Sequence, residues 1–208
     1  MRNLAESLLA VKAVKIQPHQ PFTWASGWTS PFYCDNRKLV SYPEIRDYLK
    51  VKIANLILDK YPECEGIAGV ATGAIPIAAI VADTMGLPFV YIRSAQKDHG
   101  TKNLIEGELL GDNYVIIEDL VSTGGSSIKA LNALREKDCN VLGMIALFTY
   151  GFPQATKAFQ EAGCELTTVT NYEELSKTAI SEGYINPEDQ TILDDWRTHP
   201  DTWQAPQQ

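Results

Sequence analysis

The middle of the chain alternates short apolar runs with longer amphipathic stretches. The apolar runs, which are rich in β-branched residues, occupy residues 66–70, 88–93, 113–119 and 141–150. Between them, residues 75–85 and 126–137 have the length of helices. Alternating strands and helices predict a parallel sheet, and almost uniformly apolar strands are typical of a sheet covered on both faces. The sequence therefore predicts a doubly wound, mainly parallel α/β core.

Two helices and an aromatic segment are expected ahead of this core. One helix is expected over residues 3–14 and the other from Tyr42 to Leu58, with Pro43 at a first-turn position that tolerates proline. The segment between them, 22–36 (FTWASGWTSPFYCDN), is rich in aromatic and turn-forming residues. Such segments cover a core as loops or short strands. We therefore predict a small N-terminal hood.

The chain is predicted to form a single domain over residues 1–208. Its parts are the N-terminal helices and hood in 1–60, the α/β core in 61–185 and a C-terminal tail in 186–208. From His199 onward the tail contains two prolines and three glutamines, so it is expected to be poorly ordered. Hydrophobic residues make up 45% and charged residues 21% of the chain, as in ordinary globular proteins.

The net charge, the apolar runs and the cysteines of the chain limit the partners and the cell compartment that are expected for it. A formal net charge of -8 provides no general positive field for nucleic acid. The longest apolar run, 75–82, is shorter than the roughly 18 residues of a membrane span, and Glu6 and Lys12 interrupt the apolar N-terminal stretch. The four cysteines are too far apart in sequence for a metal-ligand pair or a compact disulfide framework. We interpret them as free thiols and expect a cytoplasmic protein without a signal peptide.

The segment 115–127 (VIIEDLVSTGGSS) joins an apolar strand and two acids to a glycine-containing turn before a helix. Glycines let backbone N–H groups converge on an anion, and the helix contributes its positive end. Hydroxyl groups of Ser122, Thr123 and Ser126 add donors. The loop lacks the lysine of a nucleotide triphosphatase, whereas its acid pair can accept hydrogen bonds from ribose hydroxyls. The pattern predicts a sugar-phosphate site; the alternative is an acid-tipped strand followed by a well-capped helix.

Within this segment, EDLVSTGGS resembles the phosphoribosyl pyrophosphate motif of type I phosphoribosyltransferases. The resemblance implies the fold of that family. It also implies that the acid pair holds the ribose hydroxyls while residues 122–126 wrap the 5-phosphate. The donor-binding residues implied here are Glu118, Asp119, Leu120, Val121, Ser122, Thr123, Gly124, Gly125 and Ser126.

Residues 91–107 pass from a strand into a basic, glycine-containing loop. Four basic residues fall close together in this acidic protein: Arg93, Lys97, His99 and Lys102. Such a loop can neutralise a leaving pyrophosphate and exclude water, although many charged loops are simply solvated. The string RSAQKDHG resembles the flexible catalytic loop of orotate phosphoribosyltransferases. The resemblance implies pyrophosphate contacts from its arginine, lysine and histidine, and a homodimer in which this lid reaches the neighbouring subunit's site.

Two further segments resemble the same family. Residues 69–76 (GVATGAIP) form a weak anion-binding turn by themselves, the alternative being an ordinary proline-containing turn. The resemblance makes them the pyrophosphate loop, with Ala71, Thr72 and Gly73 presenting backbone groups. Residues 26–37 (SGWTSPFYCDNR) resemble the hood that covers the flat orotate ring. The two tryptophans of this hood either stack on the base or belong to the core or an interface. The orotate contacts implied are Phe32, Tyr33 and Ser122.

Three positions depart from the pattern of many members of the family. Ala25 stands where many have a lysine before the hood Ser-Gly, and Ser94 where many have a lysine after the loop arginine. The stretch 147–150, ending in Tyr150, lacks an arginine that binds orotate in many members. We interpret these departures as variation within the family. Otherwise the chain would bind phosphoribosyl pyrophosphate without turning over orotate.

Four motifs in the family's order, over residues 22–150, imply transfer of a phosphoribosyl group to orotate. The catalytic residues implied are Arg93, Lys97, His99 and Asp119. The magnesium ion (Mg²⁺) is expected to arrive with the anionic donor rather than in a protein metal site. Alternatives are a purine or uracil phosphoribosyltransferase, a non-catalytic sensor of the donor, and a Rossmann-like binding module, for which the dinucleotide fingerprint is missing.

Overall fold

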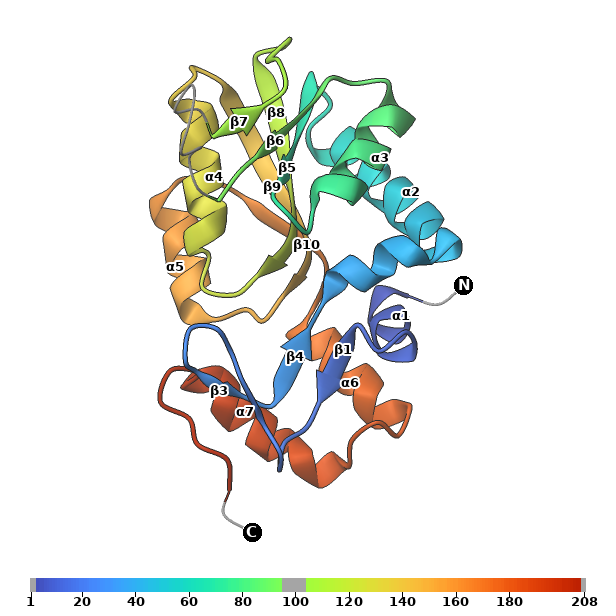
Figure 1. Cartoon of the computed structure of the whole chain (residues 1–208), viewed down its shortest axis with the longest axis vertical. Helices are drawn as coiled ribbons and strands as arrows, with labels where there is room; N and C mark the ends of the chain where they lie inside the picture. Colours follow the sequence, from blue (N-terminus) through green and yellow to red (C-terminus); the bar gives the residue numbers. More distant parts are fainter. Residues whose placement is uncertain (1–2, 95–103, 207–208) are drawn as a thin grey trace.

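The computed structural model describes residues 3–94 and 104–206, and its centre is a six-stranded sheet (Figure 1). The strand order is β10-β9-β8-β5-β6-β7, and of these neighbouring pairs only the edge pair β6 and β7 is antiparallel. This arrangement confirms the predicted doubly wound, mainly parallel sheet. Its strands are β5 (Gly66–Val70), β6 (Phe89–Ile92), β7 (Ile105–Glu106), β8 (Asn113–Val121), β9 (Asn140–Thr149) and β10 (Leu166–Asn171).

Helices cover both faces of the sheet. Figure 1 shows α2 (Pro43–Lys60) and α3 (Ile75–Met85) on one side, and α4 (Gly125–Arg135) and α5 (Pro153–Glu161) on the other. Both faces of strand β8 are buried, which is why its apolar run does not alternate with polar residues. Its successive side chains point to opposite faces, so Val115 and Ile117 join one buried cluster while Ile116 joins the other.

The N-terminal segment forms the predicted hood from two antiparallel strand pairs, β1 with β4 and β2 with β3. The first helix ends earlier than expected, because Lys12 adopts a left-handed backbone conformation (φ 53°) and Val14 already begins a strand. A 3₁₀ helix that contains Leu39 then leads into α2. This helix begins at Pro43, one residue after the predicted start at Tyr42. The elements of this region are α1 (Leu4–Ala10), β1 (Val14–Ile16), β2 (Phe22–Thr23), β3 (Thr29–Ser30), β4 (Phe32–Cys34) and the 3₁₀ helix η1 (Asn36–Ser41).

The C-terminal segment packs on the rest of the molecule as far as Trp203, so the expectation of a poorly ordered tail from His199 is wrong for the first part of that tail. After β10 come α6 (Tyr172–Ser181), the 3₁₀ helix η2 (Pro187–Asp189) and α7 (Gln190–Thr198), which lie beside the hood strands in Figure 1. Trp196 is fully buried, and Trp203 is only 6% exposed although it lies beyond His199. Two large apolar rings give this segment enough buried area to hold it in place.

None of the helices within residues 3–94 and 104–206 has the length and apolar character needed to span a membrane.

Candidate active site

The loops that follow β5 and β8 meet where the strand order of the sheet reverses. From β5 the chain continues to β6 on one side, whereas β8 pairs with β5 on the other side. Ligands of open α/β sheets bind in the crevice at such a point, beyond the carboxyl ends of the strands. A β-carbon added to Gly73 would lie only 1.9 Å from Oδ2 of Asp119. The structure therefore brings the predicted pyrophosphate loop directly against the predicted ribose-binding acid.

The turn between β8 and α4 is built to receive an anion. Gly124 has a φ of +86°, a left-handed conformation that favours glycine, and it stands at the N-cap of α4. No side chain caps this helix, so the first-turn N–H groups remain available to a ligand. Gly125 and Ser126 are exposed and Ser122 and Thr123 are half-buried. This arrangement suits the phosphate that the sequence pattern predicts.

The two acids at the end of β8 have different environments. Glu118 is only 3% exposed, and its carboxylate accepts hydrogen bonds from the Asp119 backbone N–H and the Ser127 hydroxyl, both at 3.0 Å. Burial, together with the neighbouring Asp119, raises the pKa of Glu118 to about 8. Asp119 is half-buried, and burial raises its pKa as well. Asp119 thus offers the accessible carboxylate, while Glu118 braces the loop; ribose contact by either acid stays a prediction.

We expect Glu118→Gln to stabilise the protein above pH 4.5. Because the folded-state pKa is about 8 and the ordinary value is 4.5, folding takes up a proton and the free energy of unfolding falls as pH rises through this window. The glutamine removes this dependence. Thermal unfolding measured across the window should show a gain over wild type that grows with pH and vanishes at its acidic end. A gain that is constant with pH, or one shared by the exposed-site control Glu136→Gln, would contradict the assignment.

A cavity of about 370 Å³ lies between the hood and the carboxyl ends of β8 and β9. Its walls are mainly apolar and aromatic with a few polar groups, which is the usual character of a small-molecule site. The predicted orotate contacts Tyr33 and Ser122 both line it, so the structure brings these two residues together. The complete lining is Thr23, Trp24, Ala25, Tyr33, Cys34, Leu120, Ser122 and Tyr150.

The Phe32 ring does not line this cavity, and an orotate contact by Phe32 stays a prediction. Strand β4 alternates its side chains, so Phe32 points inward and is completely buried, whereas Tyr33 points outward and is 41% exposed. The Phe32 ring packs on Trp196, with ring centroids 5.1 Å apart. Of the two hood tryptophans, Trp24 lines the cavity, and its Nε1 donates to the Phe32 carbonyl at 2.8 Å.

The base of the predicted lid adjoins the pyrophosphate loop. The Ala71 N–H donates to the Ile92 carbonyl at 2.8 Å, which places the ends of β5 and β6 side by side. Arg93 follows β6 at once, and its Nη1 lies 3.5 Å from Oε1 of Glu106. Two other residues assigned to the lid, Lys97 and His99, lie outside the described residues, so their roles stay predictions.

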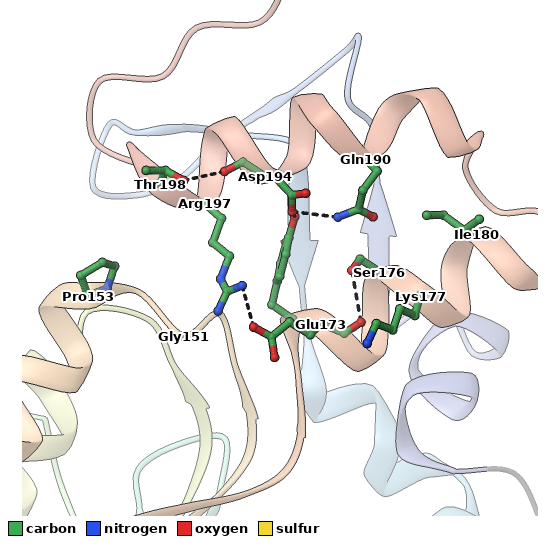
Figure 2. Close-up of a pocket in the computed structure, with 11 residues that line it drawn as sticks. Gly151, Pro153, Glu173, Ser176, Lys177, Ile180, Gln190, Asp194, Arg197 and Thr198 are labelled. Carbon is green, nitrogen blue, oxygen red and sulfur yellow. Dashed lines mark hydrogen bonds and ion pairs between the residues drawn. The ribbon is translucent and has the colours of Figure 1, made fainter.

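A second, larger pocket of about 730 Å³ lies between α6 and α7, away from the phosphate loop (Figure 2). Its most prominent cation, Arg197, is already engaged: Nη1 binds Glu173 at 2.9 Å and Nε donates to the Tyr150 carbonyl at 3.1 Å. Arg197 therefore has a structural role in this pocket: it holds α7 against the end of β9. The sequence analysis did not predict α7.

Comparisons with known proteins agree with this geometry. Residues 44–181 match the phosphoribosyl transferase domain family. The chain is 58% identical to an orotate phosphoribosyltransferase of Phocaeicola vulgatus, over 97% of this chain and 95% of that protein, and 56% identical to that of Bacteroides thetaiotaomicron, over 99% of each. The crystal structure of orotate phosphoribosyltransferase from Aeropyrum pernix is similar, with a TM-score of 0.74, 26% identity, and coverage of 88% of this chain and 99% of that one.

These likenesses extend over nearly the whole chain. The chain belongs to the orotate phosphoribosyltransferase family.

Proposed function

We propose that this protein transfers the 5-phosphoribosyl group from phosphoribosyl pyrophosphate to orotate, giving orotidine 5'-phosphate and pyrophosphate in pyrimidine biosynthesis. One observation carries the proposal: the 370 Å³ cavity shares Leu120 and Ser122 with the strand and loop that would hold the donor. A base in this cavity therefore lies beside a phosphate on the loop. This adjacency is what a transfer between base and sugar phosphate requires.

The reaction needs positioning and charge stabilisation more than proton transfer. The acidic ring nitrogen of orotate attacks the anomeric carbon as an anion, while the bond from that carbon to pyrophosphate breaks. Asp119 holds the ribose hydroxyls, and residues 122–126 hold the 5-phosphate. Thr72 and Gly73 bind the pyrophosphate, and the lid residues Arg93, Lys97 and His99 neutralise it as it leaves.

Magnesium belongs to this proposal as an ion carried by the donor. Within the described parts of the chain, no cluster of three or more His, Cys, Asp or Glu side chains could hold a metal. Asp119 lies half-buried beside Gly73 of the pyrophosphate loop, and its carboxylate would fit an ion that the donor already binds. Bound in this way, the ion neutralises part of the negative charge of the pyrophosphate.

The proposal includes a homodimer in the cytoplasm. In it, the lid of one subunit reaches the active site of its partner, so both subunits contribute to each site. All four cysteines are described and are free thiols, which supports a reducing compartment.

Gly73→Ala should weaken donor binding. The new β-carbon would lie 1.9 Å from Oδ2 of Asp119, a distance that forces the carboxylate away from the ribose position. Losing a hydrogen bond to a charged group costs about 1.5–3 kcal/mol, so the KM for phosphoribosyl pyrophosphate should rise roughly ten- to a hundredfold. Steady-state kinetics with the donor varied measure this effect. A double-mutant cycle is the control: adding Gly73→Ala to Asp119→Ala should raise the KM little further, because the carboxylate it would displace is already gone. An equal effect of Gly73→Ala in both backgrounds would show that the Asp119 contact is not the cause.

The experiment that tests the function follows the absorbance of orotate in the presence of phosphoribosyl pyrophosphate and magnesium, with hypoxanthine, guanine and uracil in parallel. We expect orotate to be consumed only when both additions are present. Consumption of another base instead of orotate would identify that base as the acceptor. Donor binding without consumption of any base would instead identify a sensor.

A further inference from the structure

Within residues 3–94 and 104–206, no positive side chain lines the base cavity. Lysine, arginine and histidine are all missing from the eight described residues that line it. Orotate differs from uracil by a carboxylate, and a carboxylate removed from water must be hydrogen-bonded. The described walls of the cavity offer only neutral donors for this group. The inference that follows rests on the proposed function, because it concerns how that base is recognised.

Tyr150 lies at the wall of the cavity, and its ring is packed among neighbouring aromatic rings. The residue is 1% exposed, yet it lines the cavity. Ring centroids of neighbouring aromatic residues lie 5.0–5.3 Å away on Phe148, Phe152, Trp24 and Trp196. A ring enclosed in this way cannot change its rotamer without displacing several neighbours. The direction of its hydroxyl is thus fixed by packing.

The Tyr150 hydroxyl has no hydrogen-bond partner in the described parts of the chain. It is not sealed in apolar core either, because the one sealed, unpaired side-chain polar atom found among these residues is Nε1 of Trp196. The contrast with Tyr172 is informative: that residue belongs to the same aromatic cluster, but its hydroxyl donates to Asp194 at 3.0 Å. Most buried hydroxyls are paired, so an unpaired one at a cavity wall points to a ligand.

The neighbours of this hydroxyl leave it protonated and free to donate to a ligand. Cys34 lies close enough to affect the Tyr150 phenol, and burial and Asp119 raise the pKa of Cys34, so it stays an uncharged thiol. Its Sγ donates to Oδ1 of Asn36 at 3.2 Å and does not compete for the tyrosine hydroxyl. Burial also raises the pKa of Tyr150 itself, which keeps the phenol protonated and able to donate.

We propose that the Tyr150 hydroxyl donates a hydrogen bond to the carboxylate of orotate and thereby selects this base. The C-terminal helix positions the donor: Arg197 binds the Tyr150 carbonyl at 3.1 Å, and Trp196 packs on its ring. Figure 2 shows Arg197 extending from α7 toward the loop at Gly151, next to this strand end. The charge of Arg197 is used to hold the strand, and the neutral hydroxyl meets the ligand.

The test compares Tyr150→Phe with the matched control Tyr172→Phe, which removes a hydroxyl from the same aromatic cluster. Since a hydrogen bond to a charged group is lost, the KM and the dissociation constant of orotate should rise roughly ten- to a hundredfold in Tyr150→Phe. The KM of the donor should stay within about twofold, because the donor lies outside this contact. The control should keep wild-type values for orotate. Melting temperatures establish that both variants are folded.

The carboxamide analogue of orotate identifies the group that is recognised. As an inhibitor it should lose much less affinity than orotate in Tyr150→Phe, since its amide is a weaker acceptor than a carboxylate. Equal losses for both would place the contact on the ring and overturn the assignment, as would an unchanged orotate affinity. Calorimetric binding of orotate separates this inference from the function. Wild-type binding without turnover would refute the proposed function alone, whereas no binding and no turnover would refute both.

Discussion

Trp196→Ala should lower the free energy of unfolding by about 3–5 kcal/mol, the usual cost of deleting a fully buried large aromatic side chain. Trp196 has no exposed surface, and its ring packs on Phe32, Tyr150 and Phe152 with centroid distances of 5.1–5.3 Å. These partners come from the hood and from the end of β9. The cavity left by alanine would therefore weaken the packing between α7, the hood and the end of β9. Urea-induced unfolding with both the midpoint and the slope recorded measures the loss.

Trp196→Phe is the informative control, because Nε1 of Trp196 is buried without a hydrogen-bond partner among the described residues. Phenylalanine keeps most of the apolar contact and removes the unpaired N–H group. We expect it to cost less than about 1.5 kcal/mol, as volume-similar substitutions do. If alanine and phenylalanine destabilise equally, ring packing is not the source of the stability. The alanine variant that remains folded should also bind orotate more weakly, since Trp24 and Tyr150 line the base cavity.

Lys97→Ala should lower the turnover rate at saturating substrates by at least ~10²-fold, by analogy with the loss of a transition-state donor. Pyrophosphate gains negative charge as its bond to the anomeric carbon breaks, and a lysine ammonium stabilises that charge. Rapid-quench or steady-state measurement of orotidine 5'-phosphate formation gives the rate. Lys97→Arg keeps the charge with a different shape and should retain more activity than alanine. Wild-type turnover in the alanine variant would refute the catalytic role of Lys97.

The strand, turn and helix proposed to bind phosphate could be predicted because their determinants are local in sequence. The strand, acid pair, glycine turn and helix of 115–135 follow one another directly, and each has its own residue preference. Likewise Pro43 marked the start of α2 correctly. The contact between Gly73 and Asp119 required only the parallel pairing of β5 with β8.

The base cavity was less predictable because its walls come from distant parts of the chain. The sequence did not show which of Phe32 and Tyr33 faces inward, since β4 is only three residues long and its register depends on pairing with β1. Nor did it show that Trp196 would pack behind Tyr150. Tyr150 itself was recognised only as a departure from a family pattern, and its unpaired hydroxyl became visible in the folded structure.

The contact between hood and C-terminal helix also sets an order of events during synthesis. His19 of the hood lies 2.8 Å from Asp189 beside α7, at a sequence separation of 170 residues. Contacts this distant in sequence form late, whereas β8, its turn and α4 can assemble as soon as they leave the ribosome. A nascent chain therefore acquires its phosphate-binding turn before its base cavity. Until α7 emerges, Phe32 and Trp24 lack Trp196, the ring that packs on both of them in the finished fold.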